Sequence, residues 1–383
     1  MQTISIARTI VVAAAILGTG YVAAIAQTPG ERDQDFGRNS ASKRDEVQQA
    51  ADHGDALAQE RLAVMYATGQ GVARDDQAAV VWWTRAANSG DAKAIWELGL
   101  EYVAGTRVGC DYNAAFAWFQ RGADQGHAFS QEWLAHMLSG EYTGIARDDA
   151  RAAYWYRQAA DQGVPGAERC LGDLYAQGKG LQQDSRQAIF WWTRAAEKGD
   201  SEAQRELAAT YFSGHGVPVD LPVAAHWYQM AANSGDGEAV VMLADMYRSG
   251  TGVPIDYQKA AALYLKSARR GWASAQLRLG DMYEVGQGVS KNLVIAFAWN
   301  EIVIERTVTP LDQKLELLMQ QSLPPDALKA ANESVAKESI LASNNVARLS
   351  RSLAPAEIAR AHQMVLAWQP GLAMDDTGVE LKP

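Results

Sequence analysis

The sequence predicts an all-α solenoid of about seven two-helix repeats, closed at each end by a helical cap. Glycine recurs every 36 residues, with one interval of 37, at Gly54, Gly90, Gly126, Gly163, Gly199, Gly235 and Gly271. Leucine stands eight residues after each of these glycines, and an aromatic pair recurs near position 28 of most units. Two helices per unit cannot bury their apolar faces alone, so successive units must stack.

Composition excludes several other classes of protein. The chain has 383 residues, of which 48% are hydrophobic and only 11 are proline, so it is not disordered. Its 2 cysteines cannot form a disulfide scaffold over this length. A formal charge of −10 argues against nucleic acid or anionic lipid as a partner, because both require a basic surface.

The first residues predict an export signal. Arg8 precedes an apolar run, and Ala24-Ile25-Ala26 is a small-x-small site for signal peptidase, so residues 1–26 are a predicted signal peptide cleaved after Ala26. A retained membrane anchor is the alternative, although the apolar run is short for a membrane span. The mature chain is then soluble and exported, either periplasmic or secreted, and 27–44 is a flexible polar segment.

Each unit predicts two helices joined by a glycine-containing turn. In the first unit, Ala58, Leu62 and Tyr66 share one face of a helix that Gly69 ends. Asp75 is the expected N-cap of the second helix. Position nine after the boundary glycine is always Ala or Gly, which lets a neighbouring helix approach closely.

Both ends of the array predict caps. Residues 45–53 form a lone helix before Gly54, so the repeat array with this helix covers 45–306. Helical patterns at 310–321, 325–343 and 355–368 form a C-terminal cap over 307–369, and 370–383 is a tail.

These units resemble Sel1-like repeats, which are relatives of tetratricopeptide repeats. The clearest match runs from Gly199 through Leu207, Tyr211, the loop 214–217 and Asp220 to the pair Trp227-Tyr228. The resemblance implies a right-handed superhelix in which the first helices line a concave groove. The third unit departs from the pattern at Glu141 and has one additional residue, and the second has Arg107 in place of a loop glycine.

No motif predicts catalysis, a cofactor or a metal centre. The glycine loops lack the Gly-Lys-Ser/Thr ending of a phosphate-binding loop, and the six histidines show no metal-ligand spacing. Two Ser-x-x-Lys matches, at Ser40 and Ser334, have no accompanying Lys-Thr-Gly motif. Cys110 and Cys170 lie two repeats apart, too far for a disulfide, so both thiols are predicted to be unpaired.

The first helices of the second and third repeats predict a protein-binding site. At positions three, six, seven and ten, most repeats place polar groups, whereas these two place the hydrophobic residues Trp96, Leu100, Phe129 and Trp133 outward, with His136 beside them. An apolar patch in a groove is a usual docking place for a peptide. The alternative is that these side chains pack against neighbouring helices.

The expected function is a non-enzymatic, exported scaffold or adaptor that binds a protein or peptide in the solenoid groove. Two alternatives stay open. One is a periplasmic regulator of a membrane signalling system such as a sensor kinase. The other is an enzyme acting on cell-wall or β-lactam substrates, which only cysteine-rich relatives of these repeats suggest.

Overall fold

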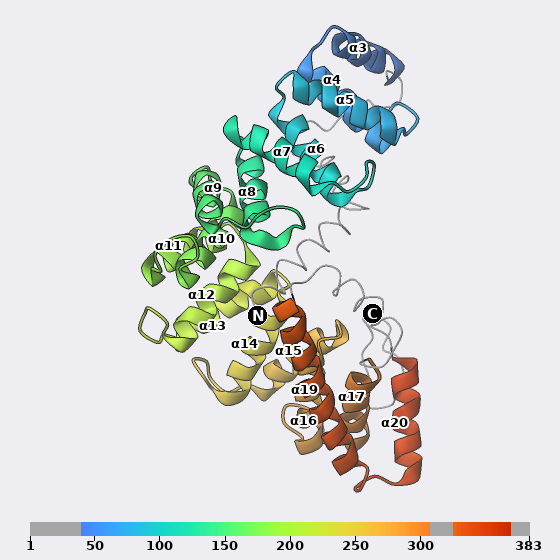
Figure 1. Cartoon of the computed structure of the whole chain (residues 1–383). Helices are drawn as coiled ribbons and strands as arrows, with labels where there is room; N and C mark the ends of the chain where they lie inside the picture. Colours follow the sequence, from blue (N-terminus) through green and yellow to red (C-terminus); the bar gives the residue numbers. More distant parts are fainter. Residues whose placement is uncertain (1–39, 307–324, 369–383) are drawn as a thin grey trace. The chain divides into compact units, whose positions relative to one another are not determined.

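The computed structural model describes residues 40–306 and 325–368, and within them the fold contains 17 α-helices and one π-helical turn with no strand (Figure 1). The first helices of the seven repeats are α4 (Ala56–Thr68), α6 (Ala92–Ala104), α8 (Ala128–His136), α10 (Pro165–Gln177), α12 (Ser201–Ser213), α14 (Gly237–Ser249) and α16 (Ala273–Val285). The second helices are α5 (Asp76–Asn88), α7 (Tyr112–Asp124), α9 (Asp149–Asp161), α11 (Ser185–Glu197), α13 (Leu221–Asn233), α15 (Tyr257–Arg269) and α17 (Leu293–Arg306). The prediction of an all-α solenoid built from helix pairs is confirmed.

The helices form two compact units that divide at Ala195, near the end of α11. In the N-terminal unit α6 and α8 each pack against the second helix of their own repeat and against that of the preceding repeat, while α4 packs on α5 and on α3 (Ser40–Asp52). Helix α10 packs on α9, and its Gly172 and Asp173 meet Trp192 of α11. The C-terminal unit repeats this arrangement from α12 to α17. Each unit therefore buries a continuous core between successive helix pairs, as a stacked repeat protein must.

Aspartate and glycine set the helix ends as predicted. The Asp75 carboxylate accepts a hydrogen bond from the Ala78 backbone nitrogen at 2.9 Å, and Asp111, Asp148, Asp184, Asp220 and Asp256 cap their helices in the same way. Gly69 ends α4 in the left-handed conformation, with φ of 76°. The equivalent glycines end α6, α10, α12, α14 and α16.

Two positions inside each first helix explain the close packing of the pairs. A Cβ on Gly172 would lie 2.6 Å from the Trp192 ring, and one on Gly99 would lie 2.3 Å from Phe119. The neighbour that requires a small residue at position nine is thus the second helix of the same repeat. Four repeats also carry a buried glutamine whose amide donates to a carbonyl at the end of the preceding helix: Gln59, Gln131, Gln204 and Gln276.

The third repeat is irregular, as its additional residue predicts. Helix α8 is short and continues into a π-helical turn, Met137–Glu141, in which Gly140 has a φ of 96°. A π-turn inserts a residue without ending the helical path. The repeat therefore keeps its stacking position despite its altered length.

The terminal helices pack on the array but differ in extent from the prediction. Helix α3 (Ser40–Asp52) begins at Ser40, before the predicted start at Asp45, and packs on α4. In the C-terminal unit α19 (Pro325–Leu349) and α20 (Pro355–Ala367) both pack on α17. The predicted signal peptide, the predicted helix at 310–321 and the tail at 370–383 lie outside the described residues, and the division into domains stays a prediction.

Candidate functional site

Position ten of the first helix faces the second helix of the same repeat. In three repeats its side chain forms a hydrogen bond, at 2.5–2.9 Å, with an aromatic residue at position 29, which is position 30 in the third repeat because of its additional residue. The pairs are His136 with Tyr156, Asp173 with Trp192, and Asp245 with Tyr264. The expectation that position ten points away from the core is therefore wrong, because the two helices of a repeat cross at this position.

Leu100 occupies position ten of the second repeat, so the prediction that it points outward and contacts a partner is also wrong. Its side chain is only 4% exposed and belongs to the same buried cluster as Phe119, which stands at position 29. A nonpolar pair here replaces the hydrogen-bonded pairs of the other repeats. Leu100 supports the patch from beneath and is not available to a partner.

Trp133 and His136 form an aromatic chain that links two repeats. The Trp133 ring stacks on Phe119 at a centroid distance of 5.6 Å and meets His136 edge-on at 5.9 Å. The Tyr156 hydroxyl lies 2.7 Å from Nδ1 of His136. Burial, reinforced by the nearby Arg169 charge, lowers the pKa of His136 to about 3, so this imidazole is neutral at neutral pH.

Trp96 and Phe129 form a second aromatic group that reaches the surface. Their ring centroids lie 5.6 Å apart, and both rings contact His127, at 6.4 Å and 6.0 Å. Phe129 is 48% exposed, whereas Trp96 and His127 are half-buried. We call Trp96, His127 and Phe129 the aromatic trio, and it is the part of the predicted site that a partner can reach.

His127 was missed in the sequence, although a signal for it exists. It stands at position one, where four other repeats have an N-capping aspartate, namely Asp55, Asp91, Asp200 and Asp236. Its Nδ1 atom accepts a hydrogen bond from the backbone nitrogen of Ser130 at 3.3 Å and so caps α8. Burial lowers the pKa of His127, which favours the neutral ring that this capping bond requires.

Helix α6 and the neighbouring α4 carry three buried carboxylates, those of Glu60, Glu97 and Glu101. Lys93 forms an ion pair with the buried Glu60 across the two helices at 2.7 Å. Glu97 is only 5% exposed, and its Oε1 atom is buried without a hydrogen-bond partner among the described residues. Burial raises the pKa of Glu97 to about 7, against the lowering effect of Lys93, and the nearby Glu60 and Glu101 add to the rise.

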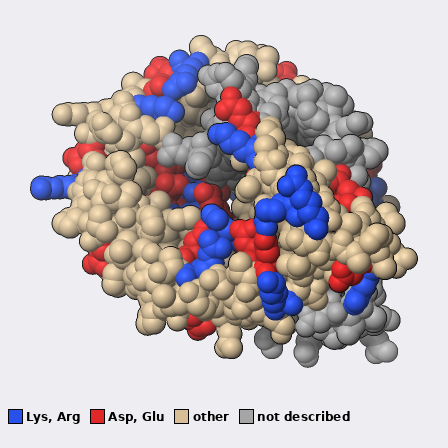
Figure 2. Space-filling model, turned by 90° about the horizontal axis from the view of Figure 1, so that it is seen from below, with Lys and Arg blue, Asp and Glu red and all other residues tan. Residues whose placement is uncertain are grey.

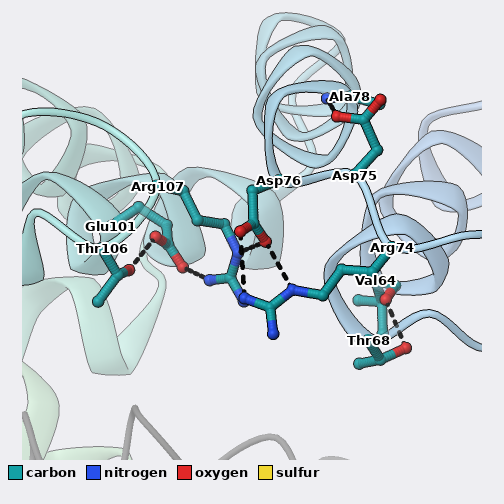
Figure 3. A network of polar contacts seen from close by, with 9 residues as sticks. All are labelled: Val64, Thr68, Arg74, Asp75, Asp76, Ala78, Glu101, Thr106 and Arg107. Carbon is teal, nitrogen blue, oxygen red and sulfur yellow. Dashed lines mark hydrogen bonds and ion pairs between the residues drawn. The ribbon is translucent and has the colours of Figure 1, made fainter.

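Arg107 joins two repeats on the other side of α6 (Figure 3). Its guanidinium donates to Asp76, the first residue of α5, at 3.1 Å and to the buried Glu101. Thr106 donates to the second oxygen of Glu101 at 2.6 Å, and Arg74 donates to Asp76 at 3.1 Å. The carboxylates of Asp76 and Glu101 thus both have cationic hydrogen-bond donors within the protein. Neither carboxylate needs a ligand to balance its charge.

Comparison with known proteins places the repeats in one family. A model of the Sel1 repeat matches residues 56–91, 92–127, 128–164, 167–200, 201–236, 237–272 and 273–299. The chain belongs to the Sel1-repeat family.

Two solved structures resemble this Sel1-repeat chain closely. A protective antigen present in uropathogenic Escherichia coli strains is 30% identical, with a TM-score of 0.67 over 83% of this chain and 69% of its own. A Sel1 repeat protein from Oxalobacter formigenes is 34% identical, with a TM-score of 0.60 over 72% of this chain and 80% of its own. No curated protein matches the chain.

Proteins of the Sel1-repeat family generally mediate protein–protein interactions, and their scaffold is typically non-catalytic. On the face drawn in Figure 2, acidic and basic side chains alternate and do not form separate blocks of one sign. Sel1 repeats suggest a protein partner.

The described residues offer little else that could carry chemistry. They contain no group of three histidine, cysteine, aspartate or glutamate side chains able to hold a metal ion. Cys110 is exposed, Cys170 is buried, and both are free thiols as predicted. Across 40–306 and 325–368, none of the helices combines the length and apolar composition of a membrane span.

Proposed function

We propose that this protein is an exported, non-enzymatic scaffold or adaptor that binds a protein segment on the first helices of its second and third repeats. The observation that carries this proposal is the aromatic trio, which exposes the Phe129 ring beside Trp96. Exposed aromatic rings held by a rigid element are typical anchors for a partner protein.

The other repeats support this location by contrast. Phe129 stands at position three of the third repeat. The same position in five of the other six repeats is Lys93, Gly166, Glu202, Glu238 or Ser274. Position six, occupied by Trp96, is charged in four others: Glu60, Glu132, Arg169 and Arg205. Only the junction of repeats two and three therefore combines aromatic side chains at both positions.

Affinity capture tests this location. The full chain, its Trp96→Ala/Phe129→Ala variant and a Tyr154→Ala control are used to capture proteins from the envelope fraction of the source cell, with mass spectrometry as readout. Tyr154 is a matched control because it is an aromatic residue of α9 that is 54% exposed. We expect the double variant to lose partners that the control retains, and identical partner sets for all three chains would contradict the proposal.

Export has a separate test. Intact-mass measurement of the protein recovered from its native cell gives the first residue of the mature chain. We expect a chain that begins at Gln27, whereas a mass including 1–26 would indicate a retained signal or anchor.

A further inference from the structure

We propose that the Nε2 atom of His127 donates a hydrogen bond to a backbone carbonyl of an extended, apolar segment of the partner protein, one of whose side chains covers Phe129. This inference rests on the proposed function, because it gives the partner's chemistry at the same surface. Three features carry it: the ring nitrogen of His127 that the protein leaves free, the exposed ring beside it, and the nearby charge of Asp91.

The capping bond of His127 determines which ring nitrogen carries the proton. Nδ1 accepts a hydrogen bond from the backbone nitrogen of Ser130 at 3.3 Å, so Nδ1 is deprotonated. The Ser130 hydroxyl lies 2.9 Å from the same nitrogen and can donate to it as well. Burial lowers the pKa of His127, so the ring is neutral at neutral pH and its one proton is on Nε2.

The Nε2 atom is a hydrogen-bond donor without an acceptor in the protein. Within 40–306 and 325–368, the hydrogen bonds of the His127 side chain all involve Nδ1 and Ser130. The His127 side chain is half-buried, but the buried polar atoms that lack a partner in this part of the chain do not include its Nε2. Water therefore reaches Nε2, and a bound partner can reach it too.

This free donor belongs to the ring next to the exposed Phe129. The two ring centroids are 6.0 Å apart, and Phe129 is 48% exposed. An apolar side chain that covers Phe129 would also displace water around the neighbouring His127. A donor that loses its water without gaining an acceptor weakens binding, so a partner that fits this surface must bring an acceptor for Nε2.

The charge of Asp91 favours a neutral acceptor. Asp91 caps α6 through the Ala94 backbone nitrogen at 2.7 Å, and its charge acts on the His127 ring. A carboxylate from the partner would be repelled by Asp91, whereas a carbonyl oxygen carries no net charge. Helical carbonyls are already bonded within their helix, but those of an extended segment are free. The expected acceptor is therefore a backbone carbonyl of an extended segment.

The other repeats support a role for His127 beyond capping. Four of them have an aspartate at the same position, and its carboxylate caps the helix but can only accept hydrogen bonds. Aspartate is among the preferred N-cap residues, so capping alone does not require histidine. What histidine adds in the third repeat is a donor on the side of the ring opposite the capping bond.

Selected peptides test the inference. A library of random dodecapeptides displayed on phage is panned on the purified full chain. The enriched peptides are synthesised with all backbone amides and as a series in which one amide at a time is replaced by an ester. Fluorescence anisotropy measures their affinities for the wild type, two variants at His127 and Phe129→Ala.

The variants at position 127 separate capping from hydrogen-bond donation. His127→Ser and His127→Asp both keep a side chain that caps α8, and both lack the ring N–H. Urea midpoints confirm that the two variants are folded. His226→Ser is the matched control, because His226 is an exposed histidine whose ring lies edge-on to Trp227 at a centroid distance of 5.5 Å.

We expect the enriched peptides to be apolar and poor in aspartate and glutamate. Both His127 variants should weaken their binding about three- to tenfold, and Phe129→Ala about tenfold, while His226→Ser should not change it. One ester, whose carbonyl is a weaker acceptor than that of an amide, should weaken binding to the wild type but barely affect binding to His127→Ser. NMR of histidine-labelled protein should show the proton on Nε2 in the free chain, with slower proton exchange once a peptide binds.

The possible failures are distinguishable. Affinities unchanged in both His127 variants, ester effects that are equal in the wild type and His127→Ser, or enriched peptides dominated by acidic residues would overturn this inference. The proposed binding surface would stand in those cases if Phe129→Ala still weakens binding. Affinities unchanged by Phe129→Ala, or no enrichment on the wild-type chain, would overturn both.

Discussion

The guanidinium of Arg107 binds the carboxylate of Asp76 at 3.1 Å, across the boundary between the first two repeats. Five other repeats place a loop glycine at the position of Arg107, and in three of them the glycine backbone abuts the first residue of the preceding second helix. A Cβ on Gly180, Gly252 or Gly288 would lie 2.0–2.5 Å from the carbonyl oxygen of that residue. In the second repeat a side-chain ion pair replaces this close backbone contact.

Removing the Arg107 side chain should destabilise the N-terminal unit strongly. Glu101 would lose its cation while its side chain stays only 8% exposed, so Arg107→Ala should cost about 3 kcal/mol of unfolding free energy. Urea unfolding followed by circular dichroism measures this. Glu101→Gln in the same chain should recover part of the loss, because no buried charge then lacks a partner.

Arg74 provides the control for this network. It binds the same carboxylate, Asp76, but its side chain is 63% exposed. Arg74→Ala should therefore leave the urea midpoint almost unchanged. Equal effects of the two arginine substitutions would contradict the assignment of Arg107 as the residue that joins the repeats.

Enlarging Gly172 should overpack a helix pair. A Cβ there would lie 2.6 Å from Trp192 and 3.1 Å from a backbone oxygen of α11, so Gly172→Leu should cost roughly 1–3 kcal/mol. Gly109→Leu is the control, because a Cβ on Gly109 has no heavy atom within 4 Å. Melting curves that shift equally for both variants would show that position nine has no special packing role.

The helix pairs were predictable because local signals repeat. Each boundary glycine, N-capping aspartate and buried leucine recurs at the same place in successive units, so an ambiguous signal in one repeat is resolved by the others. Asp75 and Gly69 illustrate this, since their roles in the structure are those that the pattern indicated.

The candidate site was less predictable, because helical periodicity gives the direction of a side chain around the helix axis only to within a fraction of a turn. Leu100 shares a helix face with Trp96 in projection, yet the crossing with α7 buries it. The contacts of Arg107 also depend on which helix end lies opposite its loop. Such contacts between repeats arise from three-dimensional stacking, which the spacing of residues within one unit does not specify.

The aromatic residues of the predicted site should separate into structural and surface groups. Trp133 stacks on Phe119, so Trp133→Ala should cost about 2–3 kcal/mol of unfolding free energy. Phe129 is half exposed, and Phe129→Ala should cost less than about 1 kcal/mol. Urea midpoints of the two variants test this, and a larger loss for Phe129→Ala would contradict the division.

His136 should make the chain sensitive to acid. Its pKa in the folded state is about 3, below the ordinary value of 6.5, so the unfolded chain takes up a proton first as the pH falls. Stability from this residue is therefore complete above about pH 6.5 and is lost towards pH 3, by at most about 5 kcal/mol.

The His136→Asn variant isolates this effect. An amide oxygen can accept the Tyr156 hydroxyl but does not titrate, so the loss of stability between about pH 6.5 and pH 4.5 should be smaller than in the wild type. Urea unfolding across that range measures the difference. Parallel pH curves for the two chains would mean that His136 is not the responsible group.

Glu97 should act in the opposite direction. Its pKa in the folded state is about 7, above the ordinary value of 4.5, so the folded chain holds a proton that the unfolded chain has already released. Its contribution is fully present below about pH 4.5 and is lost as the pH rises through about 7, by up to about 3 kcal/mol.

Glu97→Gln should abolish this dependence, because the amide keeps the shape of the protonated acid without titrating. At about pH 8 the variant should be more stable than the wild type, whereas at about pH 5 the two should be similar. Urea midpoints at both pH values give the comparison, with the exposed Glu197→Gln as control. Equal stabilities of the variant and the wild type at about pH 8 would mean that Glu97 does not titrate near neutral pH in the folded chain.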